Sequence, residues 1–102
     1  MSQIQIDIPA DEIEAFCRRN HIRKLSLFGS VLREDFRGDS DVDVLVEFDE
    51  AHIPGLIRLG GMAAELSAIL GGRQVDLLTP DDLSEYFRDE ALRAAEVLYG
   101  PA

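Results

Sequence analysis

The sequence has few basic residues, a single cysteine and no long apolar run, and each shortage excludes a class of protein. Ten Lys and Arg side chains stand against 20 Asp and Glu side chains, so the formal net charge is −10 at pH 7. A field of this sign repels phosphate backbones, and we therefore expect no direct binding of DNA or RNA. A basic partner protein or a bound cation suits this charge better.

The single cysteine, Cys17, excludes an intramolecular disulfide framework, and within a predicted helix it is expected to be a buried thiol. No uninterrupted apolar stretch approaches the roughly 20 residues that span a membrane, and no apolar segment follows a positively charged start. These absences predict a cytoplasmic protein without a membrane partner. The length of 102 residues predicts a single domain, residues 1–102, with one small core.

Hydrophobic periodicity predicts helices that alternate with strands. The expected elements are a helix over residues 10–20, a strand over 22–29, a strand over 41–48, a helix between 53 and 72, and a strand over 73–79. Gly60-Gly61 would kink the second of these helices or delay its start. A short helix after Ser30 and one or two helices from Pro80 to the end of the chain complete the order αβαβαβα.

The strand over residues 41–48 carries an unusual pair of carboxylates. Its alternation places Val42, Val44, Val46 and Phe48 on one face and Asp41, Asp43, Leu45 and Glu47 on the other. Asp41 and Asp43 therefore stand side by side and repel each other. A hard divalent cation between them would relieve this repulsion, and Mg²⁺ prefers one or two carboxylates completed by water and phosphate oxygens.

Three further residues extend this candidate site. Gly29 lets the backbone approach a ligand closely, and Ser30 opens a predicted helix whose free N–H groups favour a phosphate. Asp76 interrupts an otherwise apolar strand, and it would join the carboxylate pair if its strand lay beside the strand over residues 41–48. Three converging carboxylates suit phosphoryl transfer assisted by two metal ions.

These residues form a recognisable pattern. Gly29-Ser30, ten further residues and then Asp41-Val42-Asp43 give G-S-x10-D-x-D, which resembles the DNA polymerase beta-like nucleotidyltransferase superfamily. With Arg33 and the apolar run after the aspartates, the chain resembles the minimal nucleotidyltransferase branch. The resemblance implies an α/β (α+β) fold, in which helices flank a small mixed sheet of three or four strands.

The resemblance also implies roles for individual residues. Gly29 and Ser30 match the pair that contacts the nucleotide phosphates, and the basic residue Arg33 could contact a phosphate as well. Asp41 and Asp43 match the catalytic carboxylates that bind the metal ions, and Asp76 is the candidate for the third. The implied cofactor is Mg²⁺, as two ions, and the implied substrate is ATP.

Small members of the branch that this chain resembles act as antitoxins that move AMP from ATP to a tyrosine hydroxyl of a HEPN-domain ribonuclease toxin. The resemblance thus implies a protein adenylyltransferase that forms a hetero-oligomer with such a toxin. One alternative is a nucleotidyltransferase for a small molecule such as an aminoglycoside, but the chain has no room for an acceptor domain. Another is an antitoxin that blocks its partner sterically without catalysis, which the intact Asp41 and Asp43 argue against.

Each candidate residue also has a purely structural reading. The aspartates of the 41–48 strand could be exposed acids at a strand end, Ser30 could be a helix cap, and Asp76 could pair with Arg73. His21 and His52 lack the spacing of a metal site and are expected to lie in loops or at the surface.

Overall fold

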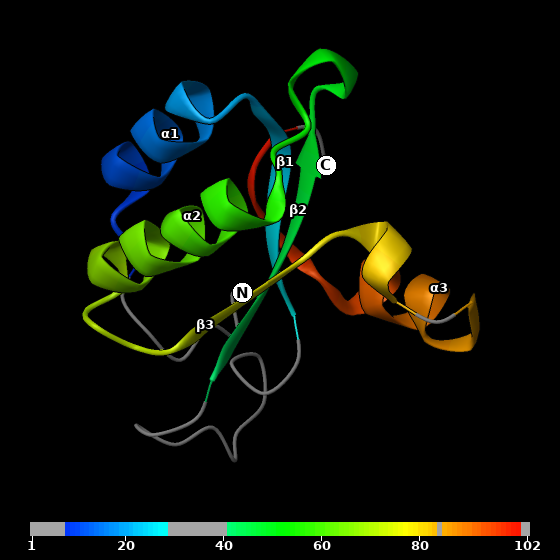
Figure 1. The fold of residues 1–102 in the computed structure, drawn as a ribbon. Coiled ribbons are helices and arrows are strands. Elements are labelled where there is room, and N and C mark those ends of the chain that lie inside the picture. Colours follow the sequence, from blue (N-terminus) through cyan, green and yellow to red (C-terminus); the bar gives the residue numbers. More distant parts are fainter. Residues whose placement is uncertain (1–7, 29–40, 84, 101–102) are drawn as a thin grey trace.

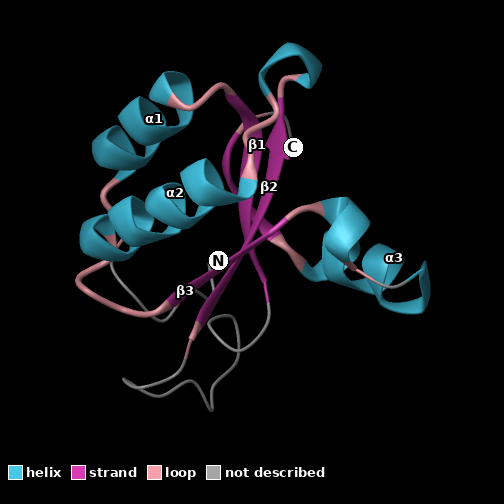
Figure 2. Ribbon diagram, viewed as in Figure 1, coloured by secondary structure: helices cyan, strands magenta, loops and turns pink. Residues whose placement is uncertain are grey.

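The computed structural model describes residues 8–28, 41–83 and 85–100. Its elements are α1 (Ala10–Arg19), β1 (Ile22–Phe28), β2 (Val42–Phe48), α2 (Leu56–Ile69), β3 (Val75–Leu78), α3 (Glu85–Ala94) and β4 (Glu96–Tyr99). Two short 3-10 helices, Glu50–His52 and Pro80–Asp82, follow β2 and β3. Figure 2 distinguishes these helices and strands by colour. The short helix expected after Ser30 lies outside the described residues.

The strands form one mixed sheet in the order β3-β2-β1-β4. β2 pairs with β3 in parallel, whereas β1 is antiparallel to both β2 and β4. Helices α1 and α2 cover one face of the sheet, and α3 lies on the other side (Figure 1). The structure therefore confirms the predicted α/β fold with a small mixed sheet and flanking helices.

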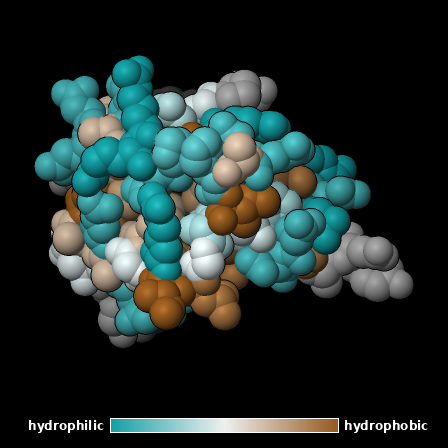
Figure 3. Space-filling view, turned by 45° about the horizontal axis from the view of Figure 1, so that its top comes forward, coloured by the Kyte–Doolittle hydropathy of each residue, from teal (hydrophilic) through white to brown (hydrophobic). Residues whose placement is uncertain are grey.

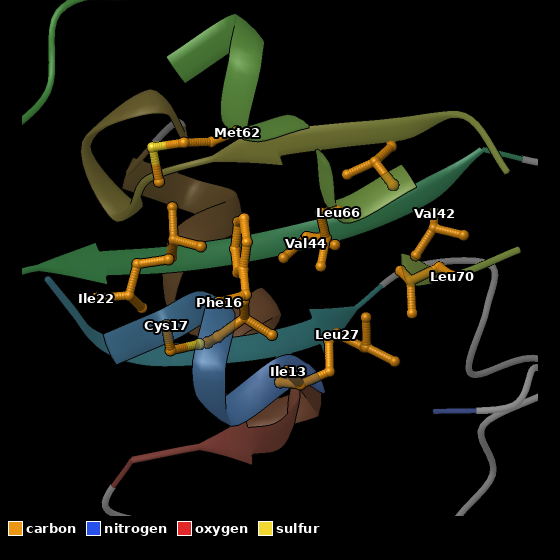
Figure 4. Packing of buried hydrophobic residues seen from close by; sticks show 13 residues of the cluster. Ile13, Phe16, Cys17, Ile22, Leu27, Val42, Val44, Met62, Leu66 and Leu70 are labelled. Atoms are coloured by element: carbon orange, nitrogen blue, oxygen red, sulfur yellow. The ribbon is translucent and has the colours of Figure 1, made fainter. Parts of the chain in front are cut away.

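The main core fills the space between the sheet and helices α1 and α2 (Figure 4). Its buried members are Ile13, Phe16, Cys17, Ile22, Leu25, Leu27, Val42, Val44, Val46, Met62, Leu66, Leu70 and Val75. Helix α1 buries its members here because they share one face at helical spacing, while its acidic and basic ends suit the helix dipole. Cys17 is fully buried as predicted, and burial raises the pKa of its thiol from 9.0 to about 12.

The alternation predicted for β2 is confirmed on both of its faces. Val42, Val44 and Val46 point into the main core. Leu45 points the other way and forms a smaller core with Phe28 and Leu83 on the α3 side. Both faces of β2 are therefore covered, which explains why this strand is richer in apolar residues than a half-exposed strand would be.

Helix α2 begins at Leu56 and runs through both internal glycines, so the expected late start is wrong. Its end is confirmed at the glycine pair that follows Leu70. Gly71 and Gly72 have φ angles of +84° and +86°, and the Gly72 N–H donates to the Ser67 carbonyl at 2.8 Å. This is a Schellman termination, which satisfies carbonyl groups that the helix leaves open.

The C-terminal segment differs from the prediction. Pro80 opens a 3-10 helix, and α3 ends at Ala94, after which Glu96–Tyr99 forms β4 instead of continuing a helix. β4 pairs with the edge of β1, and Leu98 and Tyr99 pack against the main core. The pairing is close enough that only glycine fits at position 100, where φ is +100° and a Cβ atom would collide with the Arg23 carbonyl.

No helix in the described ranges combines the length and apolar character needed to cross a membrane.

Candidate active site

The register of the sheet places Asp43 of β2 directly beside Asp76 of β3. Residues paired across a parallel ladder point to the same face of the sheet. That face is the α3 side, because Leu45 and Leu78, two residues further along the two strands, both pack in the smaller core. Asp76 was expected to join the carboxylate pair if its strand lay beside the strand of Asp43. β3 does lie beside β2, and the two aspartates are neighbours.

Asp41 immediately precedes β2 and is exposed. The next residue holds the strands together at this point, because the Val42 N–H donates to the Gln74 carbonyl at 2.8 Å. Alternation places Asp41 on the same side of the chain as Asp43. Three carboxylates thus belong to one corner of the sheet, where β2 and β3 both begin.

The three carboxylates differ in exposure. Asp43 is half-buried, whereas Asp41 and Asp76 are exposed to solvent. Carboxylate oxygens are the ligands that Mg²⁺ prefers, and Mg²⁺ commonly takes only one or two of them and completes its shell with water and phosphate oxygens. The donor set at this corner fits such an ion. Within the described ranges, no three His, Cys, Asp or Glu side chains are arranged closely enough to hold a metal by themselves.

The residues predicted to hold the nucleotide phosphates, Gly29, Ser30 and Arg33, lie outside the described residues, and their roles stay predictions. The structure does describe the end of the preceding strand. β1 ends at Phe28, and Phe28 is paired with Asp43 on the side of β2 opposite β3. Sequence reasoning missed this pairing, because the spacing between the two motif halves does not reveal how the strands are aligned.

The structure also brings together two histidines that are far apart in the sequence. The rings of His21 and His52 stack with their centroids 3.7 Å apart and their planes inclined by 10°. Asp49 lies next to them, with its Oδ2 atom 3.8 Å from Nδ1 of His52. Both histidines are exposed at the surface, as predicted: His21 lies in the turn before β1, and His52 ends the 3-10 helix Glu50–His52. No local pattern in the sequence could have revealed their contact.

The fold and the paired aspartates are those of a nucleotide-transferring enzyme. The family described as Polymerase beta, Nucleotidyltransferase matches residues 11–101. The chain therefore belongs to the polymerase beta nucleotidyltransferase family, as the G-S-x10-D-x-D pattern predicted.

The chain is also similar to individual proteins of known sequence or structure. The chain is 40% identical over 78 residues to the protein adenylyltransferase MntA of Thermococcus cleftensis, a match that covers 76% of this chain and 74% of that protein. A crystal structure of a toxin-antitoxin with AMP-PNP is similar with a TM-score of 0.73 and 22% identity, over 92% of this chain and 75% of the matched chain.

A second solved structure, of a tri-AMPylated Shewanella oneidensis HEPN toxin in complex with an MNT antitoxin, has a TM-score of 0.65 at 22% identity. It covers 90% of this chain and 70% of the matched chain. At these identities the two solved structures establish a common fold with this chain.

Proposed function

We propose that this chain is a Mg²⁺-dependent protein adenylyltransferase that moves AMP from ATP to a tyrosine hydroxyl of a HEPN-domain toxin and so acts as its antitoxin. The observation that carries the proposal is that Asp43, two residues after Asp41, pairs with Asp76 in a chain 40% identical to a protein adenylyltransferase. This chain shares its fold with an MNT antitoxin that was solved in complex with a tri-AMPylated HEPN toxin. This likeness supports a HEPN toxin as the acceptor of AMP.

In this proposal the residues of the chain divide into two groups. Asp41, Asp43 and Asp76 hold Mg²⁺, and Gly29, Ser30 and Arg33 hold the phosphates of ATP. Mg²⁺, when bound, neutralises negative charge on the nucleotide phosphates. The chain contributes mainly position and charge, as is usual in phosphoryl transfer: it aligns the α-phosphorus with the acceptor oxygen. A new P–O bond forms there while the bond to the pyrophosphate oxygen breaks, the tyrosine hydroxyl loses its proton to solvent, and pyrophosphate leaves.

The partner is expected to form the opposite wall of the site. A net charge of −10 steers a basic protein toward this chain and speeds their encounter. A stable hetero-oligomer with the toxin would then present the acceptor tyrosine to the bound nucleotide.

The test is to incubate the purified chain with Mg²⁺, α-labelled ATP and the HEPN protein encoded beside its gene, and to measure the intact mass of both proteins. We expect the partner to gain one or more AMP units. Asp43→Asn and Asp41→Asn should abolish the gain, because each removes a carboxylate from the metal site. Glu47→Gln is the matched control, since it neutralises an acid on the same face of β2 but at its far end.

Two outcomes would contradict the proposal. Full transfer by both aspartate variants would mean that these carboxylates do not hold the metal. A tight complex that blocks the toxin without any added mass would make the chain a steric antitoxin instead.

A further inference from the structure

Helix α2 has too few charged residues for a helix with one open face. Only Arg58 and Glu65 are charged among its 14 residues, whereas α1 and α3 each carry five charged residues in ten. A helix that is apolar all round is normally buried on all sides. Among the described residues, those that α2 buries lie on one side, where Met62 and Leu66 pack into the main core.

The opposite side of α2 is apolar and uncovered. We call it the outer face of α2: it consists of Ile57, Gly61, Ala64 and Ala68, which share one side of the helix at spacings of four, three and four. All four residues are exposed, and Ile57 is 95% exposed. Leu56 lies beside this face and is 87% exposed. Figure 3 shows that brown, apolar groups are scattered among mainly hydrophilic ones on one side of the molecule.

No residue that the structure describes explains the glycine in this face. A Cβ atom at Gly61 would meet no atom within 4 Å, so no neighbouring element of the described chain requires a glycine there. A glycine within a helix costs about 1 kcal/mol relative to alanine. A residue kept small on an exposed helix is what the close approach of a second helix requires.

The outer face is complementary to itself. Its positions 57, 61, 64 and 68 are symmetric about the point between residues 62 and 63. If α2 of a second copy runs antiparallel across this point, Ile57 of each copy meets Ala68 of the other, and Gly61 meets Ala64. A large side chain thus packs against a small one at both ends, and the helix axes can approach to about 8 Å.

The charges beside this face are complementary as well. Arg58 and Glu65 lie on the same flank of α2, at positions that are nearly symmetric about the same point. A two-fold axis turns Arg58 of each copy toward Glu65 of the other. Glu65 already contacts Arg19 at 2.8 Å in an exposed pair, and a second cation on the same carboxylate strengthens the network. The net charge of −10 opposes association, but salt screens it beyond about 8 Å at physiological ionic strength.

We propose that two copies of this chain associate through the outer faces of their α2 helices, packed antiparallel about a two-fold axis. The occupant of the face is thus a second copy, because both its pattern of side-chain sizes and its flanking charges are symmetric about one point. The contact is about 21 Å long, the length of a 14-residue helix. It is small for a protein interface, and we expect a weak, reversible dimer.

The first test is sedimentation equilibrium of the purified chain over a series of concentrations. We expect a monomer–dimer equilibrium for the natural chain and a dimer that is weaker by about tenfold or more for Ile57→Lys, because the symmetric interface contains the change twice. The matched control is Leu92→Lys, which makes the same kind of change at an exposed apolar residue of α3 on the other side of the sheet. It should leave the dimer unchanged.

A second variant separates dimer loss from misfolding. Gly61→Leu has open space within the chain and places a better helix former in α2, so the midpoint of thermal unfolding of the monomer should be unchanged or higher. The dimer should nevertheless be lost, because the new side chain lies where the two helices cross. A natural chain that stays monomeric at every concentration would overturn the proposal. A Gly61→Leu variant that dimerises normally would overturn it as well. If the natural chain is monomeric and Ile57→Lys no longer binds the toxin, the outer face of α2 is the surface that binds the toxin.

Discussion

At the residue scale, the site depends on neighbours that the fold supplies. Asp76 is the one carboxylate whose role rests on strand pairing, since its partner Asp43 lies on a different strand. We predict that Asp76→Asn lowers the rate of AMP transfer by more than the roughly tenfold to hundredfold typical of residues that only support a metal ligand. The midpoint of thermal unfolding should not fall, because Asp76 is exposed and the change removes a charge from beside Asp43.

The rate is read from the intact mass of the partner over time and the stability from thermal melting. A variant that melts at a lower temperature but transfers AMP at the normal rate would give Asp76 a structural role, such as an ion pair with Arg73.

Cys17 allows a prediction about pH. Burial raises the pKa of its thiol from 9.0 to about 12, so the unfolded chain loses this proton at a lower pH than the folded chain does. The stabilising contribution is complete below pH 9 and is lost as the pH rises from 9 toward 12, with a slope that approaches about 1.4 kcal/mol per pH unit.

Urea unfolding at a series of pH values should therefore show a steeper decline for the natural chain than for Cys17→Ala, which cannot ionise at this position. Equal slopes for the two chains would show that the thiol ionises equally easily in both states. In agreement with its burial, the thiol of the folded chain should also react slowly with alkylating reagents near pH 8 and quickly in urea.

At the scale of elements, a glycine within α2 and a glycine just after it predict opposite effects of the same substitution. Gly71→Ala should lower the free energy of unfolding by about 1 kcal/mol, because residue 71 ends the helix with a φ angle of +84°. Gly60→Ala should raise it by about 0.5–1 kcal/mol, because residue 60 lies within the helix and a Cβ atom there meets nothing within 4 Å. Urea denaturation of both variants checks the signs, and two changes of the same sign would contradict this reading of α2.

The elements also show what the sequence can and cannot predict. β2 was predictable, because valine at every second position indicates a strand with one face in the core. α1 was predictable from the helical spacing of Ile13, Phe16 and Cys17. β4 was not predictable, because four residues are too few to show the alternation of a strand. Their conformation is set by pairing with the edge of β1. The same limit applies to the site: the sequence reveals an aspartate in each of two strands, but only parallel pairing in one register makes them neighbours.

At the scale of the whole molecule, 20 acidic and 10 basic side chains make the chain repel itself. Any salt should therefore stabilise the fold to some degree by screening this repulsion. Divalent cations should do more if the corner where β2 and β3 begin collects carboxylates into a site. General screening and specific binding can be separated because only binding depends on particular residues.

We therefore predict that Mg²⁺ raises the midpoint of thermal unfolding more than NaCl of equal ionic strength does. A ligand that binds only the folded state stabilises it by about 1.4 kcal/mol at ten times its dissociation constant. The excess effect of Mg²⁺ should disappear in Asp43→Asn and persist in Glu47→Gln, which makes the same change in net charge further along the same strand. If both variants kept the excess, Mg²⁺ would act through the acidity of the molecule as a whole. If only Asp43→Asn lost it, the local carboxylates would be the ligands, and this result would not depend on the identity of the nucleotide or the toxin.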